Sequence, residues 1–277
     1  MKGELRSLTS ARGLAAWLVV LYHLRGATPW LPAPVMELAH KGYLAVDFFF
    51  LLSGFVIYLS AHGGLLRDGP AAIPGFLGRR FARIYPLYAV ILAGTVAFAI
   101  ILSTTGRDMS GYPWGELPLH IAMMQNWGLT DSLSWNHPAW SISAEFAAYL
   151  LFPALVLWTP ISRARRPNLL AGMMLLIAIL FLWMRQQGHA TLGDDIPANG
   201  LMRCLTEFSC GALLCAFWLR GRDCDLRSLL LSAGGTLLFW GLWASGAGGE
   251  IWAFPAGAAC LILMLAHASG LPRNPLH

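Results

Sequence analysis

The chain has 277 residues, of which 57% are hydrophobic and only 12% are charged, and its formal net charge is +5. Soluble domains carry about a quarter charged residues, so this composition excludes an ordinary soluble protein and points to a lipid environment. The basic residues are scattered between apolar runs, which argues against nucleic-acid binding. The five cysteines form no CxxC pair, so no metal site is expected.

Eight apolar runs are long enough to cross a bilayer, for which about 17–25 residues suffice. They cover approximately residues 12–30, 42–61, 86–103, 143–160, 168–184, 201–219, 228–246 and 251–269. The long connection 104–142 contains an apolar but mixed segment, 112–129, which predicts an interfacial or re-entrant helix. The expected fold is all-α: a polytopic transmembrane helix bundle of about eight spanning helices plus an interfacial helix, forming one domain over 1–277.

The distribution of Lys and Arg predicts the orientation of these runs. With a cytoplasmic N-terminus, 14 of the 19 Lys and Arg residues fall on the cytoplasmic side and 5 on the other. Every cytoplasmic segment is then basic, including the connection 62–85. We therefore expect an integral, multi-pass membrane protein with its N-terminus in the cytoplasm.

The first run carries a cation and an imidazole on one helical face. Arg12 and His23 are eleven residues apart, which is three turns plus about 20° and roughly 16 Å along the axis. This spacing places Arg12 at the cytoplasmic mouth and His23 near the middle of the membrane. Such a face suits a long anionic ligand whose reactive end reaches His23.

Three carboxylic acids also lie in apolar runs: Asp47, Glu145 and Glu207. Ionisable groups inside a membrane are costly and usually face a bundle interior or a cavity. Together with His23 they are candidates for proton chemistry, and a carboxylate at Asp47 or Glu145 could orient the imidazole. The alternative is a buried polar network that only fixes helix packing.

A basic cluster precedes the third run in the segment GRRFARIYP, 78–86. Arg80 and Arg83 are three residues apart and share a helical face, and Arg79 lies beside them. Guanidinium groups bind phosphates through two parallel hydrogen bonds, so the cluster is a candidate anion site. The alternative is a basic anchor that only enforces orientation.

Four stretches in this order resemble the acyltransferase-3 family, the membrane-bound O-acyltransferases of bacterial surface glycans. The family motifs are R-x10-H, Gly-x-x-x-Val-Asp-x-Phe-Phe-x-x-Ser-Gly-Phe, R-x-x-R before Ile-x-Pro, and Trp-Ser-x-x-x-Glu. The matching residues are Arg12 and His23; Gly42, Asp47, Ser53, Gly54 and Phe55; Arg80, Arg83 and Pro86; and Trp140, Ser141 and Glu145. The resemblance is specific over 5–150 and only topological beyond.

The resemblance implies a ten-helix bundle in a bacterial inner (plasma) membrane that moves an acyl group, expected to be acetyl, from cytoplasmic acyl-CoA to a sugar hydroxyl of a cell-envelope glycan. It also implies two further helices after LPRNPLH, so we expect this chain to lack the last two. His23 is then the catalytic base, with Glu145 or Asp47 holding the ring, and no metal takes part.

The same resemblance places Arg12, Arg79, Arg80 and Arg83 near the CoA phosphates. A relay through an acyl-serine is an alternative to direct transfer, although no serine is singled out. Two rival functions remain: a proton-coupled transporter that uses the intramembrane His, Asp and Glu, and a catalytically inactive membrane scaffold.

Overall fold

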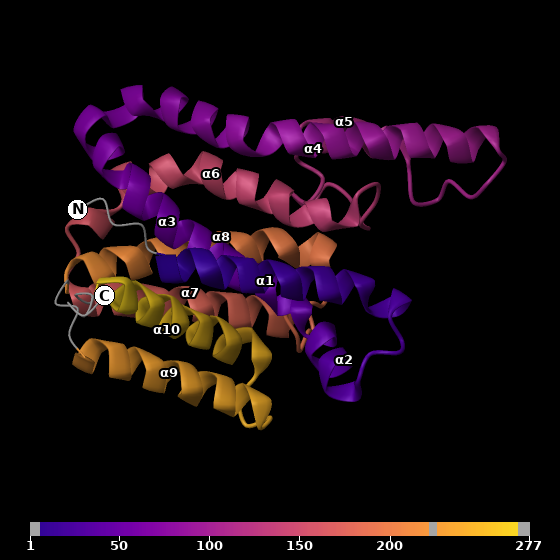
Figure 1. The fold of residues 1–277 in the computed structure, drawn as a ribbon. Helices are drawn as coiled ribbons and strands as arrows, with labels where there is room; N and C mark the ends of the chain where they lie inside the picture. The colour runs from indigo at the N-terminus through magenta and orange to yellow at the C-terminus, as the bar shows by residue number, and fades with distance from the viewer. Residues whose placement is uncertain (1–5, 222–225, 271–277) are drawn as a thin grey trace, which may run out of the picture. The chain divides into compact units, whose positions relative to one another are not determined.

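The computed structural model describes residues 6–221 and 226–270, and most of these residues are helical (Figure 1). The α-helices are α1 (Arg6–Leu24), α2 (Ala33–His40), α3 (Ala45–Asp68), α4 (Ile73–Thr104), α5 (Leu117–Ile121), α6 (Trp140–Trp158), α7 (Arg166–Gln186), α8 (Ile196–Leu219), α9 (Leu226–Ala244) and α10 (Glu250–Gly270). Short 3-10 turns flank several of them. The all-α prediction is confirmed for the described residues.

Eight of these helices have 19 or more residues, one for each predicted run. Among the described residues, five segments are long and apolar enough to cross a membrane. They are Gly42–Thr104, His137–Trp158, Arg166–Gln186, Ile196–Leu219 and Glu250–Ser269. The first segment contains both α3 and α4, whereas α1 and α9 lie outside all five. The count of about eight spans therefore stays a prediction.

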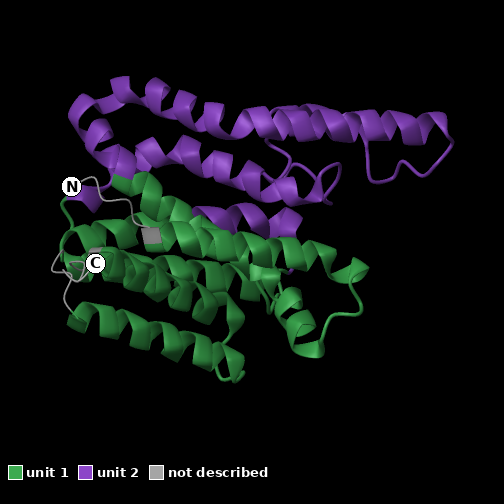
Figure 2. Cartoon of the chain, in the orientation of Figure 1, with its two compact units in different colours: residues 1–59, 163–193, 206–277 green, residues 60–162, 194–205 purple. Residues whose placement is uncertain are grey.

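The chain divides into two compact units that share it in alternating stretches (Figure 2). Unit 1 comprises residues 1–59, 163–193 and 206–277, and unit 2 comprises 60–162 and 194–205. Within unit 1, α10 packs along α9 and also contacts α7 and α1. Within unit 2, α4 packs against α5 and α6. The expectation of a single domain over 1–277 stays a prediction.

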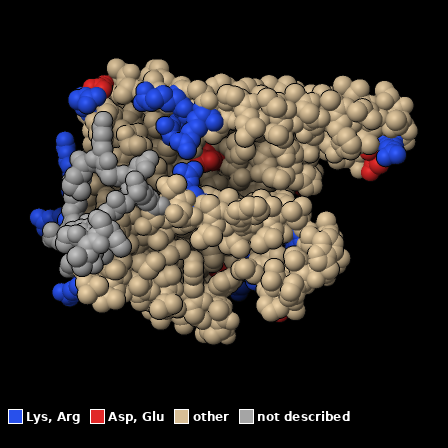
Figure 3. Space-filling view, in the orientation of Figure 1, with Lys and Arg blue, Asp and Glu red and all other residues tan. Residues whose placement is uncertain are grey.

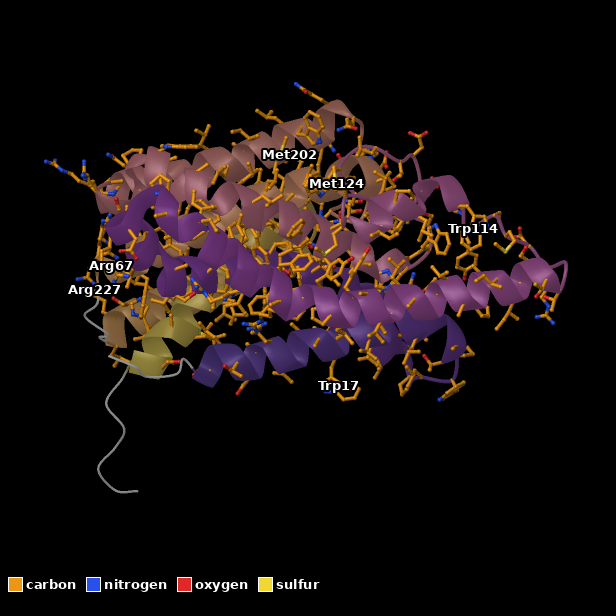
Figure 4. The ribbon with its side chains drawn as sticks, turned by 90° about the horizontal axis from the view of Figure 1, so that it is seen from above. Trp17, Arg67, Trp114, Met124, Met202 and Arg227 are labelled. Carbon is orange, nitrogen blue, oxygen red and sulfur yellow. The ribbon has the colours of Figure 1, made fainter. Side chains whose placement is uncertain are left out.

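The helices expose apolar side chains and bury polar ones. Leu237 is 76% exposed, Leu87 is 70% exposed and Trp17, which points away from α1 (Figure 4), is 68% exposed. In contrast, Asp47 and Arg203 are no more than 1% exposed. Charged side chains are almost never buried in this way in soluble proteins unless they are paired. The pattern is the one expected of helices whose outer solvent is lipid.

A pair of glycines brings α3 and α8 into backbone contact within unit 1. A Cβ atom on Gly54 would lie 1.9 Å from the carbonyl oxygen of Phe208, and one on Gly211 would lie 1.9 Å from that of Leu51. Any larger residue at either position therefore requires the two helices to separate. This close approach explains the Ser-Gly-Phe motif, because membrane helices associate mainly through such small-residue packing.

Two expected connections differ from the structure. The predicted connection 62–85 is almost entirely helical, because α3 continues to Asp68 and α4 begins at Ile73 after one short turn, Gly69–Ala72. The helix expected over 112–129 is much shorter than that segment. Only the short helix α5 forms there, and Met123 ends it by adopting a left-handed backbone conformation with φ 55°. The segment 271–277, after which two further helices were expected, lies outside the described residues.

Substitution Gly54→Ala tests the contact between α3 and α8. The added methyl group meets backbone atoms that no rotamer change can move, so we expect the free energy of unfolding to fall by about 1–3 kcal/mol. The thermal unfolding midpoint of purified protein in detergent measures the effect. Gly241→Ala on α9 is the matched control, because a Cβ there has no atom within 4 Å. Equal midpoints for the two variants would contradict the proposed contact.

Candidate functional site

Three arginines lie in the first turns of α4, where the sequence predicted an anion site. Arg79 and Arg83 are exposed, and the Nε atom of Arg80 is buried without a hydrogen-bond partner among the described residues. None of the three forms an ion pair with another described residue. Figure 3 shows a group of Lys and Arg side chains over the first half of α4, with an acidic side chain beside it. The three guanidinium groups form no ion pair within the described chain.

Arg67, which lines the same pocket as Arg79, does form an ion pair. Arg67, at the end of α3, donates two hydrogen bonds to the carboxylate of Asp68, both 2.8 Å long. A pocket of about 290 Å³ opens beside this pair, and Arg79 contributes to its wall. The start of α4 thus combines a cavity with free guanidinium groups, which is the combination that a phosphorylated ligand needs.

Arg12 and His23 both lie on α1, and both side chains are exposed. The helical spacing predicted for them is therefore confirmed. Their depth along the helix is different from the prediction, because α1 begins at Arg6 and ends at Leu24 instead of covering 12–30. Arg12 lies in the second turn, and His23 lies in the last turn rather than in the middle of the helix.

The imidazole of His23 is oriented by its own helix. Its Nδ1 atom lies 2.8 Å from the carbonyl oxygen of Val19. A carbonyl can only accept a hydrogen bond, so Nδ1 carries a proton, and in the neutral form of the ring the lone pair lies on Nε2. The edge of the Tyr22 ring also packs against the imidazole, with 5.2 Å between centroids. The tautomer that a general base requires is thus set without a carboxylate.

The sequence analysis missed a buried carboxylate, Glu250 at the start of α10. It is 6% exposed and has three donors: Tyr43 Oη at 2.7 Å, the backbone N–H of Leu192 at 2.9 Å and Lys41 Nζ at 3.2 Å. Tyr43 in turn packs edge-on against Tyr22, with ring centroids 5.8 Å apart. A chain of contacts therefore runs from Glu250 to the ring beside His23. Only the burial of the acid reveals it, since Glu250 stands at the very edge of its apolar run.

Asp47 occupies a different position from the one expected. The sequence placed it a turn and a half inside an apolar helix, but α3 begins only at Ala45, so Asp47 lies in its first turn and is fully buried. The 3-10 turn Gly42–Leu44 leads directly into α3, and the N–H of Ala45 already donates to carbonyls of that turn. Gly42 begins this turn, and a Cβ at that position would lie 2.3 Å from the carbonyl oxygen of Leu18. Gly42, in the second motif, therefore allows the backbone to pack closely against α1.

The fourth motif forms the start of α6 in unit 2. Glu145 is half-buried and accepts a hydrogen bond of 2.7 Å from Tyr149 Oη. Its neighbour Phe146 packs against Phe81, which lies between Arg80 and Arg83 in the sequence, with ring centroids 6.4 Å apart. Within unit 2, the structure therefore brings the glutamate motif to the level of the arginine motif.

A second feature that the sequence did not reveal is the role of Ser143. Its hydroxyl donates to the carbonyl of Met123 at 2.9 Å and accepts the backbone N–H of Asn126 at 3.2 Å. Both amide atoms of the Asn126 side chain are buried without a hydrogen-bond partner among the described residues. Ser143, at a variable position within the fourth motif, therefore holds a strained turn in place, because Met123 has φ 55°.

His120 anchors the same connection through a chain of hydrogen bonds. Ser134 Oγ donates its one proton to Glu116 Oε2 at 2.5 Å, so His120 Nε2, 3.0 Å from that Oγ, is the donor to Ser134. The Nδ1 atom of His120 is then the unprotonated one, and it is buried with no hydrogen-bond partner in the described part of the chain. Burial lowers the pKa of His120, although the nearby Glu116 opposes this shift.

Long helices with exposed apolar faces, buried charges and a free arginine cluster define a helical membrane protein with a candidate anion site. A family model described as an acyltransferase domain matches residues 5–275, and the chain therefore belongs to the acyltransferase-3 family. This confirms the resemblance that rested on the four motifs.

Curated relatives are named as acyltransferases. The acyltransferase MdmB of Streptomyces mycarofaciens is 35% identical over 158 residues, which cover 54% of this chain and 38% of the relative. The peptidoglycan O-acetyltransferase OatA of Listeria monocytogenes is 25% identical over 189 residues, covering 64% and 28%. The putative membrane-bound transacylase BcsY of Komagataeibacter xylinus is 25% identical over 282 residues, covering 95% and 66%. The chain thus spans less than two thirds of each of these relatives. No solved structure matches it.

The lowered pKa of His120 predicts how stability depends on pH. The unfolded histidine binds a proton below about pH 6.5, whereas the folded one resists it, so the unfolding free energy should fall as the pH drops through that value. Thermal midpoints at about pH 7.5 and about pH 5.5 measure this loss. His120→Gln keeps a donor near Ser134 and does not titrate, so it should reduce the loss, whereas His40→Gln, at an exposed histidine, should not. An unchanged pH dependence in His120→Gln would contradict the prediction.

Proposed function

We propose that this protein is an O-acyltransferase that moves an acyl group, expected to be acetyl, from acyl-CoA to a sugar hydroxyl of a cell-envelope glycan. Membership of the family supports the reaction type. The arginine cluster of α4 supports acyl-CoA as the donor, because its guanidinium groups have no carboxylate partner among the described residues. The phosphates of CoA would supply the missing acceptors, and Arg79, Arg80 and Arg83 would bind them beside the pocket of about 290 Å³.

The proposed chemistry assigns His23 as the general base. Nε2 of the neutral ring takes the proton from the sugar hydroxyl while the hydroxyl oxygen attacks the thioester carbonyl. The carbon–sulfur bond then breaks, the ester forms, and the CoA thiolate leaves and takes up the proton from the imidazolium. Val19 keeps Nδ1 protonated throughout, so the same nitrogen, Nε2, can accept and return the proton.

The remaining assignments are proposals of the same kind. Arg12 shares the exposed face of α1 with His23 and adds positive charge for the donor. Glu145 and Asp47 stay candidate catalytic residues, although the orienting role expected of them is performed at Nδ1 by a backbone carbonyl. We further propose an inner-membrane protein with a cytoplasmic N-terminus, which the basic connections support. The start of α4 then faces the cytoplasm, where acyl-CoA is made.

Substitution Arg83→Lys separates phosphate binding from simple positive charge. Lysine keeps the charge but loses the planar pair of donors, so we expect acyl-CoA binding to weaken by about 1–3 kcal/mol, the value of a charged hydrogen bond. Isothermal titration of the purified protein with acetyl-CoA measures this. Arg163→Lys, at an exposed arginine outside the motifs, is the control and should bind as the unaltered protein does. Equal affinity in both variants would show that Arg83 serves only as a charge.

Substitution His23→Ala tests the base. Membranes that contain the unaltered protein should transfer label from radioactive acetyl-CoA to a glycan fraction, and His23→Ala should abolish transfer while the protein still accumulates. His40→Ala, which removes another exposed histidine, should leave transfer intact. Normal transfer by a well-expressed His23→Ala protein would refute the catalytic role. An absence of transfer by the unaltered protein with every glycan tested would refute the proposed function itself.

A further inference from the structure

A second pocket lies along the other half of α4, and its volume is about 520 Å³. Ligand sites for small molecules commonly have volumes of about 300–1,000 Å³, so this pocket is large enough for a saccharide. Its wall comes from the end of α4 and from two segments of the connection that follows, and the lining includes Thr95, Phe98, Tyr112, Trp135, Asn136 and His137. All of these residues belong to unit 2.

The wall combines aromatic faces with short polar groups. Tyr112 packs edge-on between two rings, Phe98 at 6.0 Å and Trp135 at 5.7 Å between centroids. Asn136 and His137 follow Trp135 directly and line the same cavity. Sugar rings present apolar C–H faces and a rim of hydroxyl groups, so they bind where aromatic rings and hydrogen-bonding side chains converge.

The backbone is strained at Trp135, one of the residues of this wall. Trp135 has φ 55°, a conformation that bulky residues rarely adopt. Two hydrogen bonds hold it there: its backbone N–H donates to Gly111 at 2.8 Å, and its indole Nε1 donates to Pro113 at 3.1 Å. Trp114, beside the same half of α4 (Figure 4), packs edge-on against it with 5.2 Å between centroids. Strain that the surroundings hold in place is typical of ligand sites.

This pocket and the arginine cluster, where the donor is proposed to bind, lie at different levels of α4. Thr95 follows Arg83 by twelve residues, which is about 18 Å along one continuous helix. The arginine cluster and this pocket are therefore separated by more than half of the hydrocarbon thickness of a bilayer. A donor bound at the start of α4 and an acceptor bound here would approach the membrane from opposite sides.

We infer that this pocket, which we call the aromatic pocket, is the acceptor subsite and binds a sugar ring of the glycan. The inference rests on the proposed function and adds the place where the acceptor binds. Tyr112 stacks on the apolar face of the sugar, and Asn136 and His137 hydrogen-bond to its hydroxyl groups. A sugar on a lipid carrier and a sugar within an assembled polymer share this chemistry, and the test distinguishes them.

The test measures transfer by the full chain from acetyl-CoA to two acceptors, a lipid-linked N-acetylglucosamine saccharide and a water-soluble N-acetylglucosamine oligosaccharide. Substitutions Tyr112→Ala and Asn136→Ala should each raise the KM for the acceptor roughly three- to tenfold, as expected for the loss of one stacking or polar contact, while the KM for acetyl-CoA stays unchanged. Tyr112→Phe should restore most of the affinity because it keeps the ring. Trp158→Ala, which removes an aromatic ring that is 80% exposed elsewhere in unit 2, is the matched control.

Each outcome bears on one proposal. A change with the lipid-linked acceptor only identifies a lipid-linked sugar as the ligand, and a change with both identifies the sugar ring alone. An unchanged KM for both acceptors in Tyr112→Ala and Asn136→Ala would overturn the assignment of the aromatic pocket, even if transfer itself is confirmed. If the unaltered protein transfers nothing, saturation-transfer NMR with the water-soluble oligosaccharide still decides: binding that Tyr112→Ala abolishes supports the pocket, and no binding refutes it.

Discussion

An ion away from water must find a partner, and this constraint organises the protein from its helix surfaces to its candidate site. Glu250 obeys it with three donors. Arg80 does not, because its Nε atom is buried and has no described partner. A buried donor atom without a partner is costly, so this group is available to an acceptor outside the described chain. The proposal of an anionic ligand at the arginine cluster rests on this unpartnered atom.

The sequence predicted the long helices well because one quantity, apolar length, decides where a helix can cross lipid. It could not predict their exact ends, since those depend on turns and tertiary contacts rather than on hydropathy. Asp47 moved to a first turn because α3 begins later than its apolar run, and His23 moved to a last turn because α1 ends earlier. The structure of the connection 104–142 could not be predicted for a similar reason. Its shape depends on buried hydrogen bonds of Ser143 and His120, which leave no periodic signal.

In the candidate site, too, the sequence indicated the reactive side chains but not the groups that position them. Residue types at motif spacing identified His23, Glu145 and the arginines, because protonation and phosphate binding need particular side chains. The partners that position them were invisible to that reasoning. Val19 acts through its backbone carbonyl, and Glu250 stands outside every motif while it supports the tyrosines beside His23. Positioning groups of this kind carry no distinctive side-chain pattern, so only coordinates reveal them.

The tautomer of His23 also limits what the carboxylates of the site can do. With Nδ1 committed to Val19, a carboxylate that oriented the ring would have to bind Nε2, and it would then occupy the atom that must take the proton from the acceptor. Glu145 has a hydroxyl donor in Tyr149, so its carboxylate is held by a group other than the imidazole. In the proposed reaction, the Nε2 atom on the exposed face of α1 serves as the base, and the two acids, Asp47 and Glu145, would act through their charge rather than by orienting the ring.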